Sequence, residues 1–292
     1  MIRNNLIIYL LVLLYGCAEN TFTSPPPSSL QFGTDETLDI LTWNVENFAK
    51  SNNFTVDYLS QLIIELDADI IAMQEIGSDY YFNNLINTLD GWEGEHTSGS
   101  YGLAYIYKSE LTINEIYEIA ELDDYNLTRT PFMLELSWKG ENIYLINNHY
   151  KCCGDGIIGS NSDDEEYRRL QSVKLTKEFI DTYYEDKNII LLGDLNDELD
   201  DDEINNVFLD FINNPSQYSF TDMNIAFGSS SYWSYPSWPS HLDHILITNE
   251  LFDNHDTTYT TLVENYFSGG WAEYDEVISD HRPVGVRLIV GE

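Results

Sequence analysis

The sequence predicts an α/β fold, a four-layer α-β-β-α sandwich in which two mixed β-sheets pack together and helices cover the outside. Apolar runs of strand length outnumber the segments with helical spacing, and those helical segments fall between groups of strands. The first three elements read strand, helix, strand, which favours a parallel pair. Several apolar runs also end in polar clusters, at the strand ends where open α/β folds bind their ligands.

The N-terminal half supplies most of the predicted strands. Leu38 to Trp43 alternates in polarity and stops at Asn44, which is typical of a first core strand. Val56 to Leu66 has helical spacing, and Ala68 to Met73 is an unbroken apolar run typical of a buried strand. Further strands are expected at residues 101–107, 111–119, 131–138 and 142–146.

The C-terminal half begins with a long predicted helix. Ser162 to Glu165 reads as its capping box, with acids in the first turn opposing the helix dipole. Four apolar residues continue it at helical spacing: Leu170, Val173, Ile180 and Tyr184. Asn188 to Leu192 is another buried-strand run that leads into Gly193 and Asp194. A short helix is expected near residues 201–211, and strands at 245–248, 257–262 and 283–290.

Residues 1–17 read as an export signal. A positively charged start precedes the apolar run Leu6 to Leu14, which is too short for a membrane span of roughly 20 residues. Leu14-Tyr15-Gly16-Cys17 resembles a bacterial lipobox, whose cysteine carries a lipid; a plain signal peptide cleaved nearby is the alternative. We therefore expect an outer-membrane or cell-surface lipoprotein attached to the membrane through Cys17, or otherwise a periplasmic or secreted protein.

The remainder divides into a tether and one domain. Residues 18–36, rich in Pro, Ser and Thr, lack hydrophobic periodicity and read as a semi-rigid spacer. Residues 37–292 are expected to form a single domain. At 43% hydrophobic the chain can bury a substantial core. The protein is expected to be a monomer.

The net charge of −37, with only 13 Lys and Arg, argues against a long nucleic-acid partner. Such binding usually rests on cationic side chains that neutralise phosphates. However, divalent cations invert the local potential of a carboxylate site, and an acidic surface also serves solubility. Five basic residues gather after His149 and form either ordinary helix-surface charge or a strip facing phosphate: Lys151, Arg168, Arg169, Lys174 and Lys177.

Two adjacent cysteines, Cys152 and Cys153, follow His149 closely. Neighbouring α-carbons lie about 3.8 Å apart, whereas disulfides prefer at least about 4.4 Å. A bridge between these cysteines would therefore be strained and easily reduced. Two buried, unbridged thiols are the alternative. No second Cys/His pair has finger-like spacing, so zinc is not expected.

Six polar clusters accompany the predicted strands and supply the groups needed to hydrolyse a phosphate ester. In chain order they are Leu41–Asn44, Ile70–Glu75, Ile146–His149, Leu192–Asn196, His241–Ile247 and Ser279–His281. This reaction needs carboxylates for a hard cation, a base for water, and cationic or amide groups for the developing charge. Acids, amides and histidines are all present.

Glu75 is the first expected metal ligand, because a carboxylate at the end of a buried strand is costly without a cation or partner. Mg²⁺ typically takes one or two protein carboxylates, with Mn²⁺ or Ca²⁺ as alternative ions here. Asn44 would complete this shell or donate to a phosphate oxygen.

Asp194 and Asn196 lie two residues apart and face the same side of an extended loop. The acid would accept a proton from water while the amide holds a phosphoryl oxygen; an Asx turn is the alternative.

The order of these clusters resembles the endonuclease/exonuclease/phosphatase superfamily, which includes deoxyribonuclease I-like nucleases, inositol polyphosphate phosphatases and sphingomyelinases. The resemblance extends from about Leu38 to Val290 and implies the same sandwich architecture. Arg129-Thr-Pro-Phe132 resembles the Arg-x-Pro-Phe segment of deoxyribonuclease-like members, and an arginine fork suits a phosphate. A surface arginine before a strand is the alternative.

The resemblance also implies individual roles. Glu75 and Asp280 would bind the metal, and Asp243 would orient His281. His149 would be a second histidine that donates to the scissile phosphate. The general base is left open between Asp194 and the Asp243–His281 pair.

The expected function is that of a metal-dependent phosphodiesterase, an exported nuclease acting on DNA or RNA. The Arg129 segment, the exported context and the aromatic segment Tyr232 to Pro239 favour a nuclease, since aromatic rings stack on bases. The alternatives are a sphingomyelinase-like lipid phosphodiesterase, a phosphomonoesterase, and a catalytically silent surface-binding lipoprotein. His241 and His244, which flank Asp243, read as structural residues.

Overall fold

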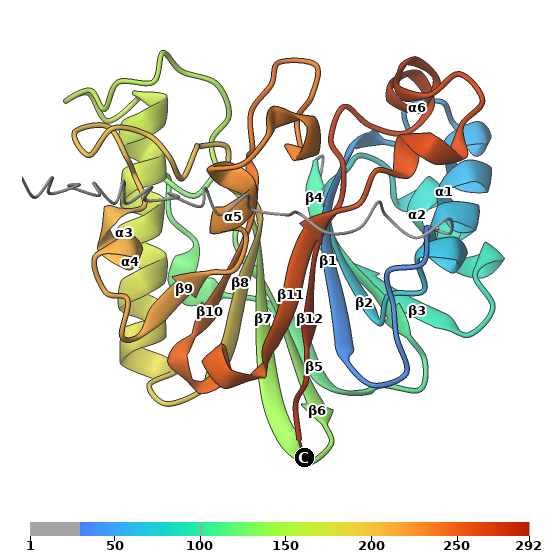
Figure 1. Cartoon of the computed structure of the whole chain (residues 1–292), viewed down its shortest axis with the longest axis horizontal. Coiled ribbons are helices and arrows are strands. Elements are labelled where there is room, and N and C mark those ends of the chain that lie inside the picture. Colours follow the sequence, from blue (N-terminus) through green and yellow to red (C-terminus); the bar gives the residue numbers. More distant parts are fainter. Residues whose placement is uncertain (1–29, 100, 292) are drawn as a thin grey trace, which may run out of the picture.

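The computed structural model describes residues 30–99 and 101–291 and has the predicted architecture of two mixed β-sheets with helices outside (Figure 1). The first sheet contains, in spatial order, β11 (His255–Thr260), β12 (Val284–Leu288), β1 (Leu38–Phe48), β2 (Ile70–Ile76), β4 (Gly102–Lys108) and β3 (Trp92–His96). The second contains β5 (Thr112–Glu118), β6 (Phe132–Trp138), β7 (Glu141–His149), β8 (Asn188–Asp194), β10 (Asp243–Thr248) and β9 (Tyr218–Phe220). The pairs β1–β2 and β7–β8 are parallel, and the other neighbouring pairs are antiparallel.

Helices cover the outer face of each sheet (Figure 1). Beside the first sheet lie α1 (Asn53–Leu66), α2 (Asp79–Thr88) and α6 (Trp271–Val277), and beside the second lie α3 (Glu165–Tyr183), α4 (Leu209–Ile212) and α5 (Met223–Ala226). Short 3-10 helices span Ala120–Leu122, Ser230–Tyr232, Asn249–Asn254 and Val263–Tyr266. None of the helices in the described part of the chain has the length and apolar character needed to cross a membrane.

The unbroken apolar runs of the sequence arise because both faces of each sheet are buried. Ile40 packs between the two sheets, whereas its neighbour Leu41 packs against the helices of the first sheet. In the second sheet, Ile190 faces the inter-sheet core and Leu191 faces the core beneath α3. Successive side chains of a strand point to opposite faces, so each central strand contributes to two cores. Each such side chain stabilises the fold by about 1.5–3 kcal/mol relative to an exposed one.

Several predicted elements need correction. The predicted helix at residues 201–211 is limited to the short α4, with turns before it. The N-cap of α3 is Asp164, whose side chain accepts from the backbone N–H of Tyr167, so the predicted capping box at Ser162 was wrong. Helix α2 and strand β3 were not predicted. Each buries little: α2 buries only Phe82 and Leu85 along its length.

Residues 30–36 belong to the folded domain, so the predicted end of the tether at residue 36 was wrong. Phe32 is fully buried, its backbone N–H donates to Leu66 O at 2.7 Å, and its ring centroid lies 5.0 Å from that of Tyr259. The guanidinium of Arg287 lies 5.1 Å from the Phe32 ring centroid. The export signal, Cys17 and residues 18–29 of the predicted tether lie outside the described residues.

Phe32→Ala tests this boundary. Emptying a fully buried aromatic site is expected to lower the free energy of unfolding by about 3–5 kcal/mol, measured by urea denaturation followed by circular dichroism. The matched control is Phe54→Ala, because Phe54 is 69% exposed and its loss should change stability by less than about 0.5 kcal/mol. Equal effects of the two substitutions would show that Phe32 does not belong to the core.

Candidate active site

The second sheet places three of the predicted residues side by side. In the strand register, His149 at the end of β7 is paired with Asp194 at the end of β8, and Asp194 is paired with Asp243 at the start of β10. Gly193 permits this close approach, because a Cβ there would lie 1.9 Å from Asn148 O, and its φ of 147° disfavours other residues.

The first sheet contributes Asn44 and Glu75 from the ends of its parallel strands β1 and β2. The register of β2 shifts around Glu75, whose φ is 65°, an uncommon conformation for a residue with a side chain. One carboxylate oxygen, Glu75 Oε2, accepts from the backbone N–H of Asn47 at 3.0 Å. The bulge thus turns the Glu75 carboxylate toward Asn47, in the irregular last part of β1. Strained residues of this kind gather at functional sites.

Asn44 connects the two sheets. Its Nδ2 donates to Asp194 Oδ2 at 2.8 Å and to Glu75 Oε1 at 3.3 Å, while its Oδ1 accepts from the backbone N–H of Glu46 at 3.0 Å. The amide nitrogen therefore faces the acids. Both amide hydrogens are engaged by these two acids, so the roles of Asn44 as a metal ligand or as a donor to a phosphate oxygen stay predictions.

Asp194 lies at the centre of the site and is 1% exposed. Burial raises the pKa of its carboxyl to about 7, although the neighbouring His281 lowers it. Its Oδ1 accepts from the backbone N–H of Asn196 at 3.1 Å, which is the Asx turn considered above. The Asn196 side chain in turn donates to Tyr150 O at 3.3 Å, so this amide supports the loop around Asp194.

His281 and Asp243 form a buried pair, the contact that the family resemblance implies. His281 Nδ1 lies 2.7 Å from Asp243 Oδ2, and its Nε2 points toward Asp194, 3.8 Å from Oδ2. Burial alone lowers the pKa of His281, but the charges of Asp243 and then Asp194 outweigh it and raise the pKa to about 10. His281 is therefore an imidazolium at neutral pH. The ring of Tyr235 packs against it, with centroids 4.8 Å apart.

The segment that carries His281 is fixed to the loop after Asn44. Ser279 Oγ donates to Asn44 O at 2.6 Å and accepts from the His281 backbone N–H at 3.0 Å. The backbone N–H of Asp280 donates to Glu46 Oε2 at 3.0 Å. The Asp280 carboxylate lies 3.9 Å from His281 Nε2 and is partly exposed. The side chains of Asp280 and His281 thus both reach the rim of the site.

His149 faces the same acids from the opposite side. Its Nε2 lies 3.4 Å from Asp194 Oδ2 and 3.9 Å from Glu75 Oε1. Burial, followed by the charges of Arg129 and His281, holds the pKa of His149 well below its usual value. Its Nδ1 is buried and has no hydrogen-bond partner among the described residues. His149 is thus a neutral imidazole beside the acids, and its N–H can donate a hydrogen bond without adding charge.

Arg129 lies at the edge of the site. Its Nε donates to Tyr101 O at 2.7 Å and its Nη1 to Thr128 Oγ1 at 3.1 Å. The neighbouring Thr128 donates through Oγ1 to His149 O at 2.7 Å, which joins this segment to the site. Burial lowers the pKa of Arg129, although the charges of Glu75 and Asp194 raise it. A cation so placed is suited to a phosphate oxygen.

The acids present fit a divalent cation. Glu75 and Asp280 offer carboxylate oxygens, the hard ligands that Mg²⁺ prefers, and both are partly exposed beside buried groups. Asp194, Asp243 and His281 also bring one ligand atom each within 4.8 Å of one another. The ligand role that the family resemblance implies for Glu75 and Asp280 stays a prediction beside this group.

A second buried cluster was missed by sequence reasoning and surrounds Asp222. Asp222 Oδ2 lies 2.6 Å from His244 Nδ1 and 3.0 Å from His241 Nε2, and Oδ1 accepts from Ile245 N at 3.0 Å. His244 Nε2 bonds Asp197 O at 2.8 Å, on the loop that follows Asp194. These atoms bind one another and could also hold a metal ion, so the structural role predicted for His241 and His244 stays a prediction. Asp222 itself follows no motif in the sequence.

The predicted basic strip is largely engaged in local contacts. Lys151 pairs with Glu165, Arg169 is buried against acids, Lys177 pairs with Asp181, and Arg168 lies over the Tyr125 ring. These contacts favour the alternative of ordinary helix-surface charge for Lys151, Arg168 and Lys177, whereas Arg169 is buried and is not a surface charge.

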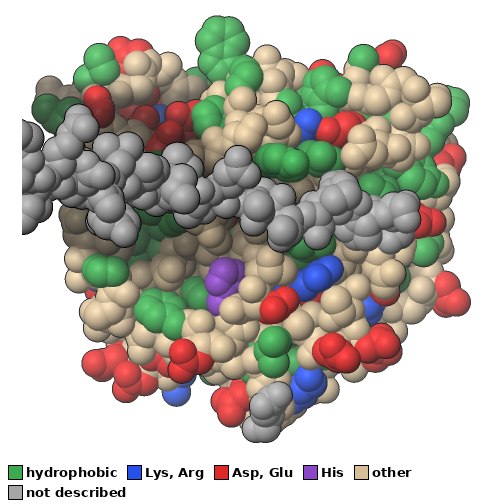
Figure 2. All heavy atoms as spheres, viewed as in Figure 1, with side chains coloured by type: hydrophobic (Ala, Val, Ile, Leu, Met, Phe, Trp, Pro, Cys, Tyr) green, Lys and Arg blue, Asp and Glu red, His purple; other side chains and the backbone are tan. Residues whose placement is uncertain are grey.

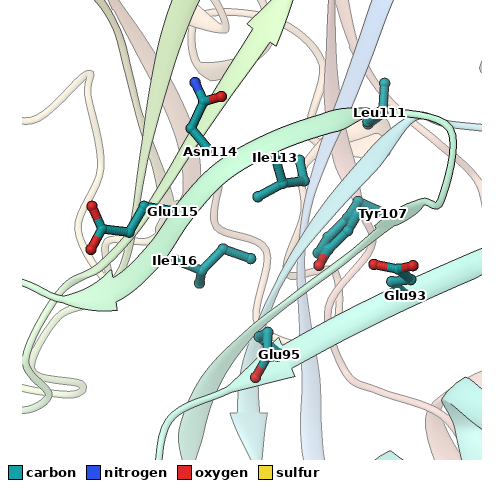
Figure 3. A pocket seen from close by; sticks show the side chains of 8 residues that line it. All are labelled: Glu93, Glu95, Tyr107, Leu111, Ile113, Asn114, Glu115 and Ile116. Carbon is teal, nitrogen blue, oxygen red and sulfur yellow. The ribbon is translucent and has the colours of Figure 1, made fainter.

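A separate hollow lies between β3, β4 and β5 and contains none of the site residues (Figure 3). Glu93 and Glu95 line it on one side and Glu115 on the other, and Figure 3 shows the Glu93 carboxylate beside Tyr107. This acidic hollow has no histidine and no basic group among its lining residues, so the candidate catalytic chemistry lies elsewhere.

Comparison with known proteins identifies the family. The model of the Endonuclease/Exonuclease/phosphatase family matches residues 41–281. No curated protein sequence matches the chain. The chain belongs to the endonuclease/exonuclease/phosphatase family, whose fold is that of phosphoester hydrolases.

Solved structures share this fold. D. rerio TDP2 complexed with single strand DNA product has a TM-score of 0.65 at 15% identity, with 87% of this chain and 99% of that chain covered. The human Nocturnin catalytic domain with bound sulfate anion has a TM-score of 0.63 at 16% identity, covering 91% and 99%. An endonuclease/exonuclease/phosphatase from Bacteroides vulgatus has a TM-score of 0.64 at 14% identity, covering 86% and 98%.

Asp222→Asn tests the structural cluster. Burial raises the pKa of Asp222, but the charge of His244 and the hydrogen bonds from both histidines outweigh it and hold the pKa below its usual value. The ionised carboxylate therefore contributes stability above its unfolded pKa of about 3.9, and this contribution is lost as the pH falls below that value. At about pH 5 the substitution should lower the free energy of unfolding by about 3–5 kcal/mol.

Urea denaturation of both proteins at about pH 5 and about pH 3 should show this difference shrinking at the lower pH. Asp90→Asn, at an exposed aspartate, is the matched control and should have little effect at either pH. A difference that does not change with pH would contradict an ionised Asp222.

Proposed function

We propose that this chain is a Mg²⁺-dependent phosphodiesterase, an exported nuclease that hydrolyses DNA or RNA as a monomer. One observation carries the proposal: groups from the ends of both sheets converge on Asp194 Oδ2, with Asn44 Nδ2 at 2.8 Å, His149 Nε2 at 3.4 Å and His281 Nε2 at 3.8 Å. An acid, two histidines and an amide around one point suit attack of water on a phosphate ester.

Asp194 is the group we assign as general base. Its pKa of about 7 is suited to accepting a proton near neutral pH. His281, with a pKa of about 10, is already protonated and cannot take that role. It instead supplies a cation to the developing negative charge, with Asp243 fixing its orientation.

The remaining groups bind the phosphoryl oxygens. His149 offers a neutral N–H, Asn44 an amide N–H, and Arg129 a guanidinium at the edge of the site. Glu75 and Asp280 would hold Mg²⁺, with Mn²⁺ or Ca²⁺ as alternatives. The bound ion would neutralise charge on a phosphate oxygen.

A nucleic acid is the substrate we favour. The aromatic segment Tyr232 to Pro239 lies next to the site, since Tyr235 packs on His281, and Trp238 is 78% exposed. Exposed rings of this kind stack on unpaired bases. Figure 2 shows acidic side chains scattered over one face of the molecule with few basic ones, which limits contacts to a long backbone. A short, single-stranded segment therefore suits this surface better than an extended duplex.

Asp194→Asn should lower kcat by about 10²–10⁴-fold, the usual contribution of a positioned base, without changing the thermal unfolding midpoint markedly. Asp200→Asn, at an exposed aspartate on the same loop, is the matched control and should retain activity. In the wild type the rate should rise through an acid limb at or below about pH 7, because a bound cation favours the carboxylate form. The variant should lack that limb.

The substrate is tested by incubating the purified protein with single-stranded and double-stranded DNA, RNA, sphingomyelin and an inositol phosphate, each with Mg²⁺ or EDTA. The proposal expects Mg²⁺-dependent cleavage of nucleic acid. Cleavage of the lipid alone would establish the lipid phosphodiesterase, and phosphate release alone the phosphomonoesterase. Inertness toward all of them would favour a binding lipoprotein.

We also propose that the protein is exported and held at the outer membrane or cell surface by a lipid on Cys17. The charged start, the apolar run and Leu14-Tyr15-Gly16-Cys17 support this proposal. A lipid and a short spacer would hold the site near substrates outside the cell.

In a bacterial host, the wild type should enter the membrane fraction and incorporate labelled fatty acid, whereas Cys17→Ser should do neither. Cys153→Ser is the matched control and should keep the label. Label that persists on Cys17→Ser would exclude lipidation at this cysteine.

A further inference from the structure

Cys152 and Cys153 lie on the loop that follows β7, immediately beyond His149. Both thiols are exposed rather than buried, and their sulfur atoms lie 2.9 Å apart. Lys151 Nζ lies 3.7 Å from Cys152 Sγ, so a cation adjoins the first sulfur. Cys153 has a φ of 73°, which places the two side chains on the same side of the chain. These thiols are accessible, adjacent and close to the candidate site.

A single buried side chain, Arg169, binds the backbone on both sides of Cys152. Its Nη1 donates to Lys151 O at 2.7 Å and to Cys153 O at 2.8 Å. The same guanidinium donates through Nε to Asp197 Oδ2 at 2.7 Å. Arg169 is only 3% exposed, so its acceptors are not readily replaced by water.

These contacts lead directly to the loop of the proposed base. Asp197 follows Asp194 by three residues and also accepts from His244 through its carbonyl. A second route runs through Tyr150, whose N–H donates to Asp194 O at 3.0 Å and whose carbonyl accepts from Asn196 Nδ2. A change in the backbone at residues 151–153 would therefore alter the support of Asp194 and Asn196 by two routes.

We propose that Cys152 and Cys153 form a redox modification site that small-molecule disulfides oxidise to a vicinal disulfide, and that this oxidation lowers turnover at the adjacent site. The Cys152 thiolate attacks one sulfur of the reagent and releases one thiolate. Cys153, as thiolate, then attacks Cys152 Sγ and releases the second. The protein loses two protons and two electrons, and the reagent becomes two thiols.

The geometry explains why the bridge would be readily reduced and how it would affect the adjacent site. Neighbouring α-carbons, about 3.8 Å apart, are closer than disulfides prefer, so ring closure must distort the peptide between the cysteines. That distortion makes the bridge easily reduced. It also displaces the carbonyls that Arg169 binds, and hence the loop of Asp197. Export, as proposed above, would place the pair where disulfides persist.

The test uses the full chain equilibrated in buffers of reduced and oxidised glutathione, followed by alkylation and peptide mass spectrometry. The expected product is a Cys152–Cys153 peptide that is two hydrogens lighter and resists alkylation. This readout needs no substrate, so it stands whether or not the nuclease proposal holds. Hydrogen exchange of the peptide that contains Asp194 to Asp197 should increase on oxidation and return after treatment with dithiothreitol.

If the activity proposed above is found, turnover should fall by at least half in step with the oxidised fraction and recover on reduction. Cys152→Ser and Cys153→Ser should each give no bridged peptide and retain turnover in oxidised glutathione. Full alkylation at every glutathione ratio would overturn the redox site. A bridge that changes neither hydrogen exchange nor turnover would overturn its coupling to the site.

Discussion

The buried carboxylate of Asp194 is the constraint on which the arrangement of the site depends. An ionised acid that is almost inaccessible to solvent is costly unless charges and hydrogen bonds compensate it. Asn44 supplies an amide from the first sheet, Asn196 a backbone N–H from its own loop, and His281 a positive charge from the segment before β12. Each donor comes from a different part of the chain, so the two sheets must meet in one register for Asp194 to be accommodated at all.

Much of the fold follows from the sequence because each central strand is buried on both faces and is therefore apolar throughout. Elements that bury little could not be predicted in this way. The edge strand β3 alternates exposed Glu93 and Glu95 with partly buried residues, and α2 buries only a narrow apolar side. The burial of Phe32 could not be predicted from the sequence, because a single aromatic residue after a Pro-rich segment shows no hydrophobic periodicity. Its burial depends on partners such as Tyr259, which are distant in sequence.

The residues of the candidate site could be named from their positions at strand ends, but their protonation states and orientations could not. Whether Asn44 turns its oxygen or its nitrogen toward the acids depends on the backbone N–H of Glu46. Whether a histidine is charged depends on its neighbours: His281 has Asp243 at hydrogen-bonding distance, whereas His149 lies near the positive charges of Arg129 and His281. The geometry thus gives opposite shifts to the pKa values of two histidines whose charge states the sequence does not reveal.

The position of β12 has a consequence for how the chain matures. This strand lies between β11 and β1, so the last strand of the chain pairs directly with the first one. The loop just before it delivers Asp280 and His281 to the other site residues. Contacts between residues so distant in sequence are slow to form. The candidate site is therefore complete only once the segment before β12 has joined the rest of the fold.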